Sequence, residues 1–120
     1  MRVLVADEQK NSRELLRILL EHEGCEVSEA SDGLQALAVA RATLPDLVLL
    51  DLDLPELDAY SAARAMRHDD RLKSRSIVAL TESTRFGNPE RLQAAGFTGS
   101  IAKPIGVRSL SAQLARLLPA

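Results

Sequence analysis

Short apolar runs alternate with helical stripes along the chain. The runs at residues 2–6, 47–50 and 76–80 are rich in Val, Leu and Ala, which is typical of parallel strands that are buried on both faces. Residues 26–30 alternate between polar and apolar positions, so they predict a half-buried strand at an edge of the sheet. A weaker run at residues 100–102 predicts a fifth strand.

Helical patterns fill the intervals between these runs. Each helix begins near a residue that favours a helix N-terminus or a turn, and the first and fourth end at a glycine. Five successive βα units predict an α/β domain with a doubly wound parallel sheet. The predicted helices begin at Asn11 or Ser12, after Ser31–Gly33, after Asp58, at Pro89 and near Val107.

The composition limits the range of functions. With 120 residues the chain has room for one domain, which we expect to span residues 1–120. The net charge of −2 gives no reason to expect nucleic acid or an anionic membrane as a partner. Cys25 is the only cysteine, which excludes an internal disulfide and favours a reducing compartment. No apolar stretch is long enough for a signal peptide or a membrane span, so we expect a soluble cytoplasmic protein.

Acidic residues gather at the carboxyl ends of two predicted strands. Asp7 and Glu8 follow the first strand and Asp51 follows the third, at the edge where open α/β sheets bind ligands. Three carboxylates in one pocket repel each other unless a cation intervenes, and Mg²⁺ prefers carboxylate and carbonyl oxygens together with water. We therefore expect Glu8, supported by Asp7, to hold Mg²⁺. Asp51 and the backbone carbonyl of Asp53 complete the predicted metal site.

The same edge of the sheet carries the other groups that phosphoryl transfer requires. That reaction needs an in-line nucleophile and neutralisation of the charge on the transferred oxygens. Asp51 is the candidate nucleophile and would form an acyl phosphate. Lys103, after the fifth strand, would pair with the phosphoryl oxygens, and Thr81, after the fourth, would donate its hydroxyl to one of them. Thr81 would thereby report whether the phosphoryl group is present.

Each of these residues also has an ordinary structural explanation. Asp7 and Glu8 could complement the positive end of a helix. Thr81 could be a turn residue, and Lys103 could be solvated. Asp51 is harder to explain in this way, because a turn aspartate rarely follows four buried aliphatic residues. Ionisable groups that cluster in one cleft are typical of a functional site, which favours the functional interpretation of the whole set.

Five short motifs occur in order along the chain, namely Val3–Glu8, Pro45–Pro55, Ala79–Thr81, Ala95-Gly96 and Ala102–Ile105. On these motifs the chain resembles the receiver domain of two-component response regulators, in particular the chemotaxis regulators, over essentially its whole length. The resemblance implies a flavodoxin-like, doubly wound five-stranded parallel sheet of order 2-1-3-4-5 with five helices. It also implies Asp51 as the phosphoacceptor and a sensor histidine kinase or histidine phosphotransfer protein as the donor. A cis Lys103–Pro104 bond is a further implication.

Several positions depart from the pattern of that family, among them Glu56 and Ala59, which stand where glycines are expected, and two further positions bear on the switch. Ser100 stands where most receivers carry Tyr or Phe, a ring that moves inward when the threonine engages the phosphoryl group. Glu82 follows Thr81 where a small residue is usual, and it would affect donor access or the lifetime of the phosphoryl group. Without the aromatic ring, we expect the loop at residues 81–89 and the helix after it to carry the response to phosphorylation.

Two alternative functions share part of this pattern. A haloacid-dehalogenase-like phosphohydrolase also uses an aspartyl nucleophile, a hydroxyl and a lysine. That family takes its nucleophile from the first strand and has metal-binding acids after the lysine, whereas residues 104–120 contain no Asp or Glu. A pseudo-receiver would be an interaction module that is never phosphorylated, and it predicts loss of the acidic pocket, which is intact here. We therefore expect a signalling switch that phosphorylates and dephosphorylates only itself, and not an enzyme.

The expected partners are proteins. A receiver without an output domain must bind a downstream protein or pass the phosphoryl group on, and we expect a monomer or weak dimer with no direct contact to nucleic acid or membrane. The predicted first helix has a wide apolar face, which either packs entirely in the core or docks a kinase or phosphotransfer helix. This face consists of Leu15, Leu16, Ile18, Leu19 and Leu20.

Overall fold

Strands and helices alternate in the computed structural model, which describes residues 1–81, 89–103 and 112–113. Every strand predicted from the apolar runs is present. The elements in chain order are β1 (Arg2–Ala6), α1 (Lys10–His22), β2 (Glu26–Ala30), α2 (Gly33–Thr43), β3 (Leu47–Asp51), α3 (Ala59–Arg67), β4 (Ser76–Thr81), α4 (Pro89–Ala95) and β5 (Gly99–Ala102).

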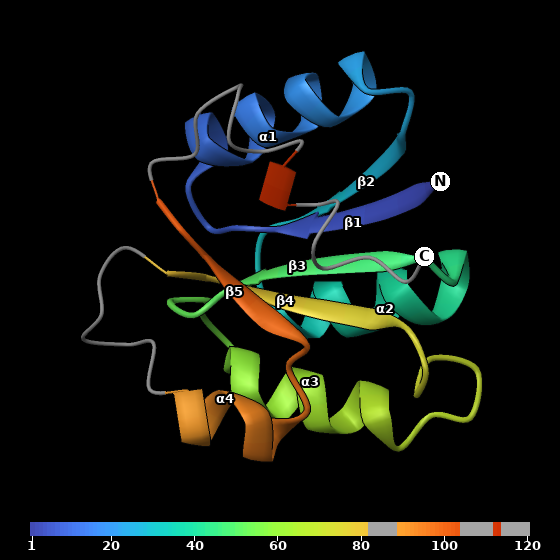
Figure 1. Cartoon of the computed structure of the whole chain (residues 1–120), viewed down its shortest axis with the longest axis vertical. Coiled ribbons are helices and arrows are strands. Elements are labelled where there is room, and N and C mark those ends of the chain that lie inside the picture. Colours follow the sequence, from blue (N-terminus) through green and yellow to red (C-terminus); the bar gives the residue numbers. More distant parts are fainter. Residues whose placement is uncertain (82–88, 104–111, 114–120) are drawn as a thin grey trace.

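All the strands are parallel and form one sheet of order β2-β1-β3-β4-β5 (Figure 1). This confirms the predicted flavodoxin-like, doubly wound architecture. Asp51 of β3 lies opposite Leu80 of β4, and Thr81 lies opposite Ala102 of β5. The carboxyl ends of β1, β3, β4 and β5 therefore meet at one edge of the sheet, at the place where the chain reverses the direction in which it adds strands.

Some predictions concern residues outside the described part of the chain. The predicted fifth helix, around residues 107–117, is described only at residues 112 and 113, which are helical. The predicted cis bond before Pro104 and the central part of the loop at residues 81–89 also lie outside the described residues.

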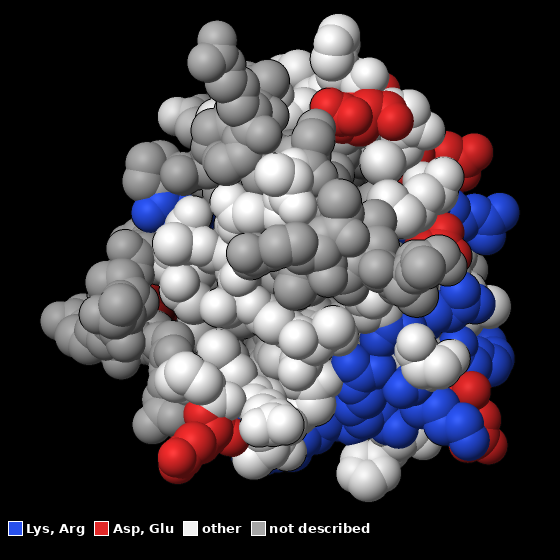
Figure 2. All heavy atoms as spheres, viewed as in Figure 1, with Lys and Arg blue, Asp and Glu red and all other residues white. Residues whose placement is uncertain are grey.

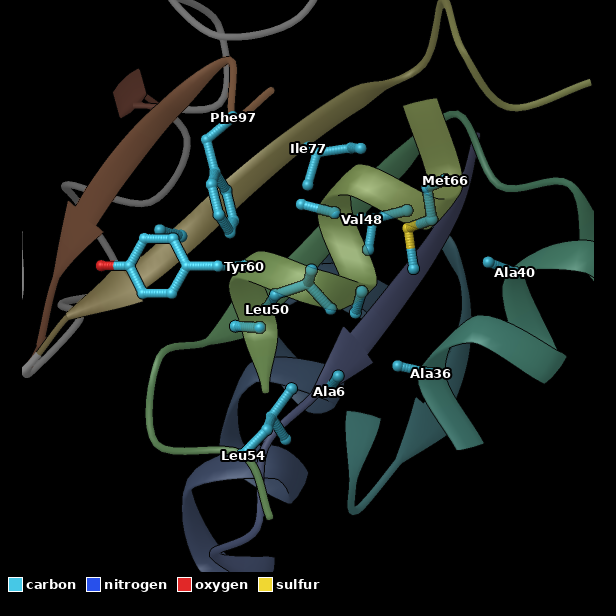
Figure 3. Packing of buried hydrophobic residues seen from close by; sticks show 14 of the residues in the cluster. Ala6, Ala36, Ala40, Val48, Leu50, Leu54, Tyr60, Met66, Ile77 and Phe97 are labelled. Atoms are coloured by element: carbon cyan, nitrogen blue, oxygen red, sulfur yellow. The ribbon is translucent and has the colours of Figure 1, made fainter. Parts of the chain in front are cut away.

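The sheet separates two clusters of buried side chains. Val48 and Leu50 of β3 point toward α2, α3 and α4, and Figure 3 shows them packed in this cluster. Leu47 and Leu49 point the other way and pack with buried residues of α1. All five residues of β3 are buried, which explains why its sequence is continuously apolar up to Asp51.

Helix α1 begins earlier than predicted. The prediction that Asn11 or Ser12 caps this helix is wrong. Gln9 is the N-cap residue, and its side chain makes no capping bond. The carboxylate of Asp7 instead accepts the backbone N–H of Gln9 at 2.9 Å. An acidic residue at the end of β1 thus binds a donor at the start of α1, so the helix begins before the polar residues that were expected to cap it.

The apolar face of α1 is divided between the core and the surface. Leu16 and Leu20 are buried, whereas Leu15 is 52% exposed and Ile18 is 55% exposed. The face is therefore wider than the contact with the sheet requires. None of the described helices is both long enough and apolar enough to cross a membrane.

Charge is distributed unevenly over the surface although the formal sum is only −2. Figure 2 shows Lys and Arg gathered on the right-hand side of the view, where Figure 1 places the N-terminus and the loop between α3 and β4. Neighbouring acids partly neutralise them, because Arg75 pairs with Asp46 at 3.1 Å and both Arg41 and Arg71 pair with Asp69 at 3.4 Å. The acidic strand ends lie at the opposite edge of the sheet.

Gly33 allows the turn before α2 to touch the loop that follows β3. Its N–H donates to the carbonyl of Pro55 at 3.1 Å. A Cβ atom at Gly33 would lie 1.6 Å from the carbonyl oxygen of Leu57, closer than any two such atoms can approach. The segment that leaves Asp51 is therefore packed against backbone that only glycine can provide.

We predict that Gly33→Ala lowers the free energy of unfolding by about 2–3 kcal/mol, because two backbone segments must separate to admit the methyl group. Gly24→Ala is the matched control. The space around Gly24 is open, so the methyl group meets only the conformational penalty of a φ of +90°, about 1 kcal/mol. Urea unfolding followed by circular dichroism measures both variants. A Gly33→Ala protein as stable as the Gly24→Ala protein would contradict the close packing of these segments.

Candidate functional site

Asp51 lies at the end of β3 with only 5% of its surface exposed. Its Oδ1 accepts the backbone N–H of Asp53 at 2.8 Å, and its Oδ2 accepts a hydrogen bond from the ammonium of Lys103. Burial raises the pKa of the Asp51 carboxyl, and the hydrogen bond from Lys103 offsets only part of the rise. The two donors hold the carboxylate in one orientation, as a nucleophile requires.

Asp7 is fully buried directly after β1 and is held by both its backbone and its side chain. Its N–H donates to the carbonyl of Ala30 at 3.0 Å, and its own carbonyl accepts Nη1 of Arg13 at 2.9 Å. Its carboxylate accepts the N–H of Gln9 on Oδ1 at 2.9 Å and the ammonium of Lys103 on Oδ2 at 2.7 Å. Asp7 therefore has a fixed position relative to α1, β2 and Lys103.

Lys103 joins the two carboxylates. It follows β5, where its N–H donates to the carbonyl of Thr81 at 2.7 Å, and its side chain is 11% exposed. Burial by itself would lower the pKa of Lys103, but the hydrogen bonds to Asp51 and Asp7 outweigh burial and raise it. Lys103 is therefore a protonated cation that contacts both carboxyl groups.

Thr81 ends β4 next to these groups and is 7% exposed. Because Asp51 lies opposite Leu80, Thr81 lies one residue further toward the carboxyl edge of the sheet. Its carbonyl also holds the backbone of Lys103, as described above. The structure thus brings together at one edge the three residues that the sequence suggests for phosphoryl transfer, Asp51, Thr81 and Lys103.

Glu8 and Asp53 lie on the solvent side of this edge, and both are exposed. The adjacent Asp7, by contrast, is fully buried and contacts Lys103. The structure gives the inward position to Asp7, whereas the sequence suggested Glu8 as the main metal ligand. Within residues 1–81, 89–103 and 112–113, no three His, Cys, Asp or Glu side chains form a group that could hold a metal ion.

The chemistry of the inward donors nevertheless fits a hard divalent cation. Asp7 and Asp51 offer buried carboxylate oxygens and already share one cation, the ammonium of Lys103. Mg²⁺ commonly binds through one or two carboxylates and keeps several waters, so a third buried acid is not required. Oδ2 of each carboxylate is the oxygen that Lys103 contacts, so a metal ion at these oxygens would compete with the ammonium.

Arg13 contacts the site although its position in the sequence gives no sign of this. It lies on α1 and would be expected to be one of several solvated arginines on that helix. Its hydrogen bond to the carbonyl of Asp7 depends on how α1 is oriented after the turn at Gln9, and an isolated sequence pattern does not contain that information.

Comparisons with known proteins agree with this geometry. The family described as "Response regulator receiver domain" matches residues 3–115. The polar-differentiation response regulator DivK of Brucella anthropi is 33% identical over 105 residues, which cover 88% of this chain and 85% of that protein.

Two solved structures are also similar. The chemotaxis response regulator CheY4 of Vibrio cholerae has a TM-score of 0.91 and 30% identity, with 98% of each chain covered. The receiver domain of the sensor histidine kinase PA1611 from Pseudomonas aeruginosa PAO1, which has a magnesium ion coordinated in its active-site cleft, has a TM-score of 0.87 and 30% identity. That match covers 97% of this chain and 95% of the other.

In metal-free buffer at neutral pH, we predict that Asp51→Asn raises the free energy of unfolding. Folding raises the pKa of Asp51 above its usual 3.8, so the folded chain binds this proton more tightly than the unfolded chain does, and stability falls as the pH rises through the interval between the two values. The advantage of the Asn variant is therefore present above that interval and disappears below it. Lys103 keeps Asp7 as a partner in the variant.

Urea midpoints of the parent and the Asp51→Asn protein, measured from about pH 3 to 8, test this dependence. A variant that is less stable than the parent at neutral pH would show that the contact with Lys103 outweighs the cost of burying Asp51.

Proposed function

The chain belongs to the family of response regulator receiver domains, and we propose that Asp51 is its phosphoacceptor. The observation that carries this proposal is the contact of one ammonium, that of Lys103, with the carboxylates of both Asp51 and Asp7. A buried carboxylate beside a cation is suited to attack phosphorus and to receive negatively charged oxygens. In this proposal residues 1–120 constitute a single receiver domain.

The donor is a phosphohistidine of a sensor histidine kinase or of a histidine phosphotransfer protein. One carboxylate oxygen of Asp51 forms a bond to phosphorus while the phosphorus–nitrogen bond breaks, and the electron pair of that bond returns to the imidazole ring. The product is an aspartyl phosphate. Because the acceptor is the chain's own side chain, the protein is a signalling switch and not an enzyme with a separate substrate, apart from the formation and hydrolysis of its own acyl phosphate.

Lys103 and Thr81 contact the transferred group in this proposal. The ammonium of Lys103 already lies against Oδ2 of Asp51 and would pair with a phosphoryl oxygen once that carboxylate is phosphorylated. Thr81 offers its hydroxyl to a second oxygen from the end of the neighbouring strand β4. Two strand ends thus supply the positive charge and the hydrogen-bond donor that the phosphoryl group requires.

The remaining acidic groups form the proposed magnesium site. Asp7 and Asp51 would hold the ion with the backbone carbonyl of Asp53, and Glu8, which is exposed at the same edge, would contact it through a bound water. Mg²⁺ bound there would neutralise charge on the phosphoryl oxygens. The magnesium ion in the similar receiver domain of PA1611 supports this assignment.

The proposed donor also indicates where the chain acts and what it binds. We place it in the cytoplasm as a monomer or weak dimer, in contact with its donor and with a downstream protein, but not with nucleic acid or membrane. Leu15 and Ile18 are exposed on α1, which begins three residues after Asp7. They are therefore suited to contact the helix of a donor whose phosphohistidine must reach Asp51.

The two alternative functions explain less. A phosphohydrolase would need further acids after Lys103, and residues 104–120 contain none. A pseudo-receiver would not be expected to keep a buried Asp7, Asp51 and Lys103 in mutual contact, since buried charges are costly unless they have a function or a partner.

We predict that acetyl phosphate adds one phosphoryl group to the chain only when Mg²⁺ is present, and that Asp51→Asn abolishes the addition. Intact-mass spectrometry measures the added phosphoryl group. Asp70→Asn is the control, because Asp70 is an exposed carboxylate at the other end of the molecule, paired with Lys73 at 3.5 Å. Small phosphomonoesters should give no multiple turnover. Addition that persists in Asp51→Asn, or that needs no metal, would contradict the proposal.

The output signal is proposed to pass through α4. Ser100 is exposed on β5 and supplies no ring. The ring of Tyr60 on α3 instead packs edge-on against Phe97 with centroids 5.9 Å apart, and the guanidinium of Arg91 on α4 lies 4.0 Å from the centre of the Tyr60 ring. Figure 3 shows Tyr60 and Phe97 side by side in the core. Helix α4 is therefore joined to α3 by an aromatic contact that needs no ring on β5.

Beryllofluoride, which stands in for the phosphoryl group, tests this route by amide chemical shifts. We predict large shifts at Asp51, at Thr81, at residues 89–95 and near Lys103, with small shifts at residues 107–117. The reverse distribution, large at residues 107–117 and small at residues 81–95, would contradict an output through α4.

A further inference from the structure

Arg13 links the edge strand of the sheet to the backbone of the candidate site. Its side chain is only 17% exposed. Nη1 donates to the carbonyl of Asp7 at 2.9 Å, and Nε donates to Oε1 of Glu29 on β2 at 3.1 Å. Two N–H groups of one rigid, planar guanidinium are thus used in two directions, in a fixed geometry that the rotatable donors of a lysine would not impose.

We propose that Arg13 is a positioning residue for the cation site, and that Glu29 holds and neutralises Arg13. The inference rests on the proposed function only in that it concerns the same site. The carbonyl that Arg13 contacts belongs to the peptide between Asp7 and Glu8. The orientation of this peptide sets the directions of both acidic side chains, so the guanidinium fixes which carboxylate points toward Lys103.

The hydrogen bonds made by Asp7 show what Arg13 contributes. The N–H of Asp7 is held by Ala30 and its carboxylate by Gln9 and Lys103, whereas the carbonyl is held by Arg13. If the guanidinium is removed, the peptide after Asp7 loses this hydrogen bond and can rotate. The two carboxylates would then no longer be preorganised for a metal ion, and partners of this kind typically affect metal affinity.

Glu29 removes an electrostatic conflict that Arg13 would otherwise create. A guanidinium near a cation site repels a second cation, and the repulsion is strong where water is excluded. The carboxylate of Glu29 pairs with Arg13 through Oε1 and with Arg17 through Oε2 at 3.3 Å. Arg13 therefore contributes hydrogen bonds at the site while much of its charge is neutralised on the far side.

Arg17 provides a matched control on the same helix. It lies one turn after Arg13, pairs with the same glutamate and has a second partner in Glu21 at 2.7 Å. The contacts described for Arg17 are with these two glutamates on the surface of the molecule, not with Asp7. Both substitutions, Arg13→Met and Arg17→Met, remove a guanidinium. Only the first removes the hydrogen bond to the carbonyl of Asp7.

Titration of Mg²⁺ followed by amide chemical shifts of the folded protein measures the expected effect directly. Arg13→Met should weaken Mg²⁺ binding about 10-fold, and Arg17→Met should leave the affinity unchanged. Glu29→Gln should also weaken binding, because it leaves the charge of Arg13 unneutralised. In the double variant Arg13→Met with Glu29→Gln, the affinity should equal that of Arg13→Met, since Glu29 acts through Arg13.

Unfolding by urea without metal separates positioning from stability. A purely structural role would lower the unfolding midpoint of Arg13→Met while the folded protein still binds Mg²⁺ with the parent's affinity, and that result would overturn the inference. Equal losses of affinity in Arg13→Met and Arg17→Met would overturn it too. If Arg13→Met does not fold, Glu29→Gln decides, because parental affinity in that variant contradicts the role of the pair.

The inference and the proposed function can fail independently. A parent protein that binds Mg²⁺ through Arg13-dependent groups but takes no phosphoryl group on Asp51 would contradict the function and leave the role of Arg13 intact. A parent that is phosphorylated normally while Arg13→Met keeps its Mg²⁺ affinity would contradict only the role of Arg13.

Discussion

The contact of the Lys103 ammonium with both Asp7 and Asp51 is the interaction on which the rest of the site depends. Two buried carboxylates in one pocket cannot both be ionised at low cost without a cation between them. The sheet order places β1 next to β3, which brings Asp7 and Asp51 together, and the N–H of Lys103 is held by Thr81 so that its side chain reaches back over β4. The parallel topology therefore brings the two buried carboxylates together and also places the Lys103 ammonium in contact with both.

The same charge balance suggests how phosphorylation changes the site. Before transfer, the Lys103 ammonium contacts both carboxyl groups, and any further cation at Oδ2 of Asp7 or Asp51 competes with it. If Asp51 accepts the phosphoryl group as proposed, the single charge of its carboxylate is replaced by a group that carries almost two charges and three acceptor oxygens. The added negative charge can then be neutralised by both the Lys103 ammonium and a metal ion. A contact that stabilises the resting carboxylates can in this way become a contact to the transferred group without a large movement of the lysine.

Most of the fold and part of the site could be predicted from the sequence. Strands β1, β3 and β4 were predictable because a strand that is buried on both faces must be continuously apolar, and Asp51 and Thr81 were predictable because each directly follows such a run. Lys103 follows the weaker run of β5. The choice between Asp7 and Glu8 was not, since adjacent residues look equivalent in a sequence and only the backbone direction after β1 gives one of them the inward position. The start of α1 was also missed, because the carboxylate of Asp7 accepts the N–H of Gln9, and the helix then begins before the polar residues that the sequence suggests as caps.

Strand β2, the least apolar strand, also has contacts that could not be predicted from the sequence. The alternation of β2 identifies it as an edge strand, and its exposed Glu29 would ordinarily be assigned to the solvated face. In the structure that carboxylate receives two arginines from α1, spaced four residues apart on one face of the helix, and only the first of them reaches the carbonyl beside Asp7. A polar residue on an edge strand thus gains a role through the helix that crosses over it. The spacing of Arg13 and Arg17 alone could not distinguish the arginine that holds the site from the one that lies on the surface.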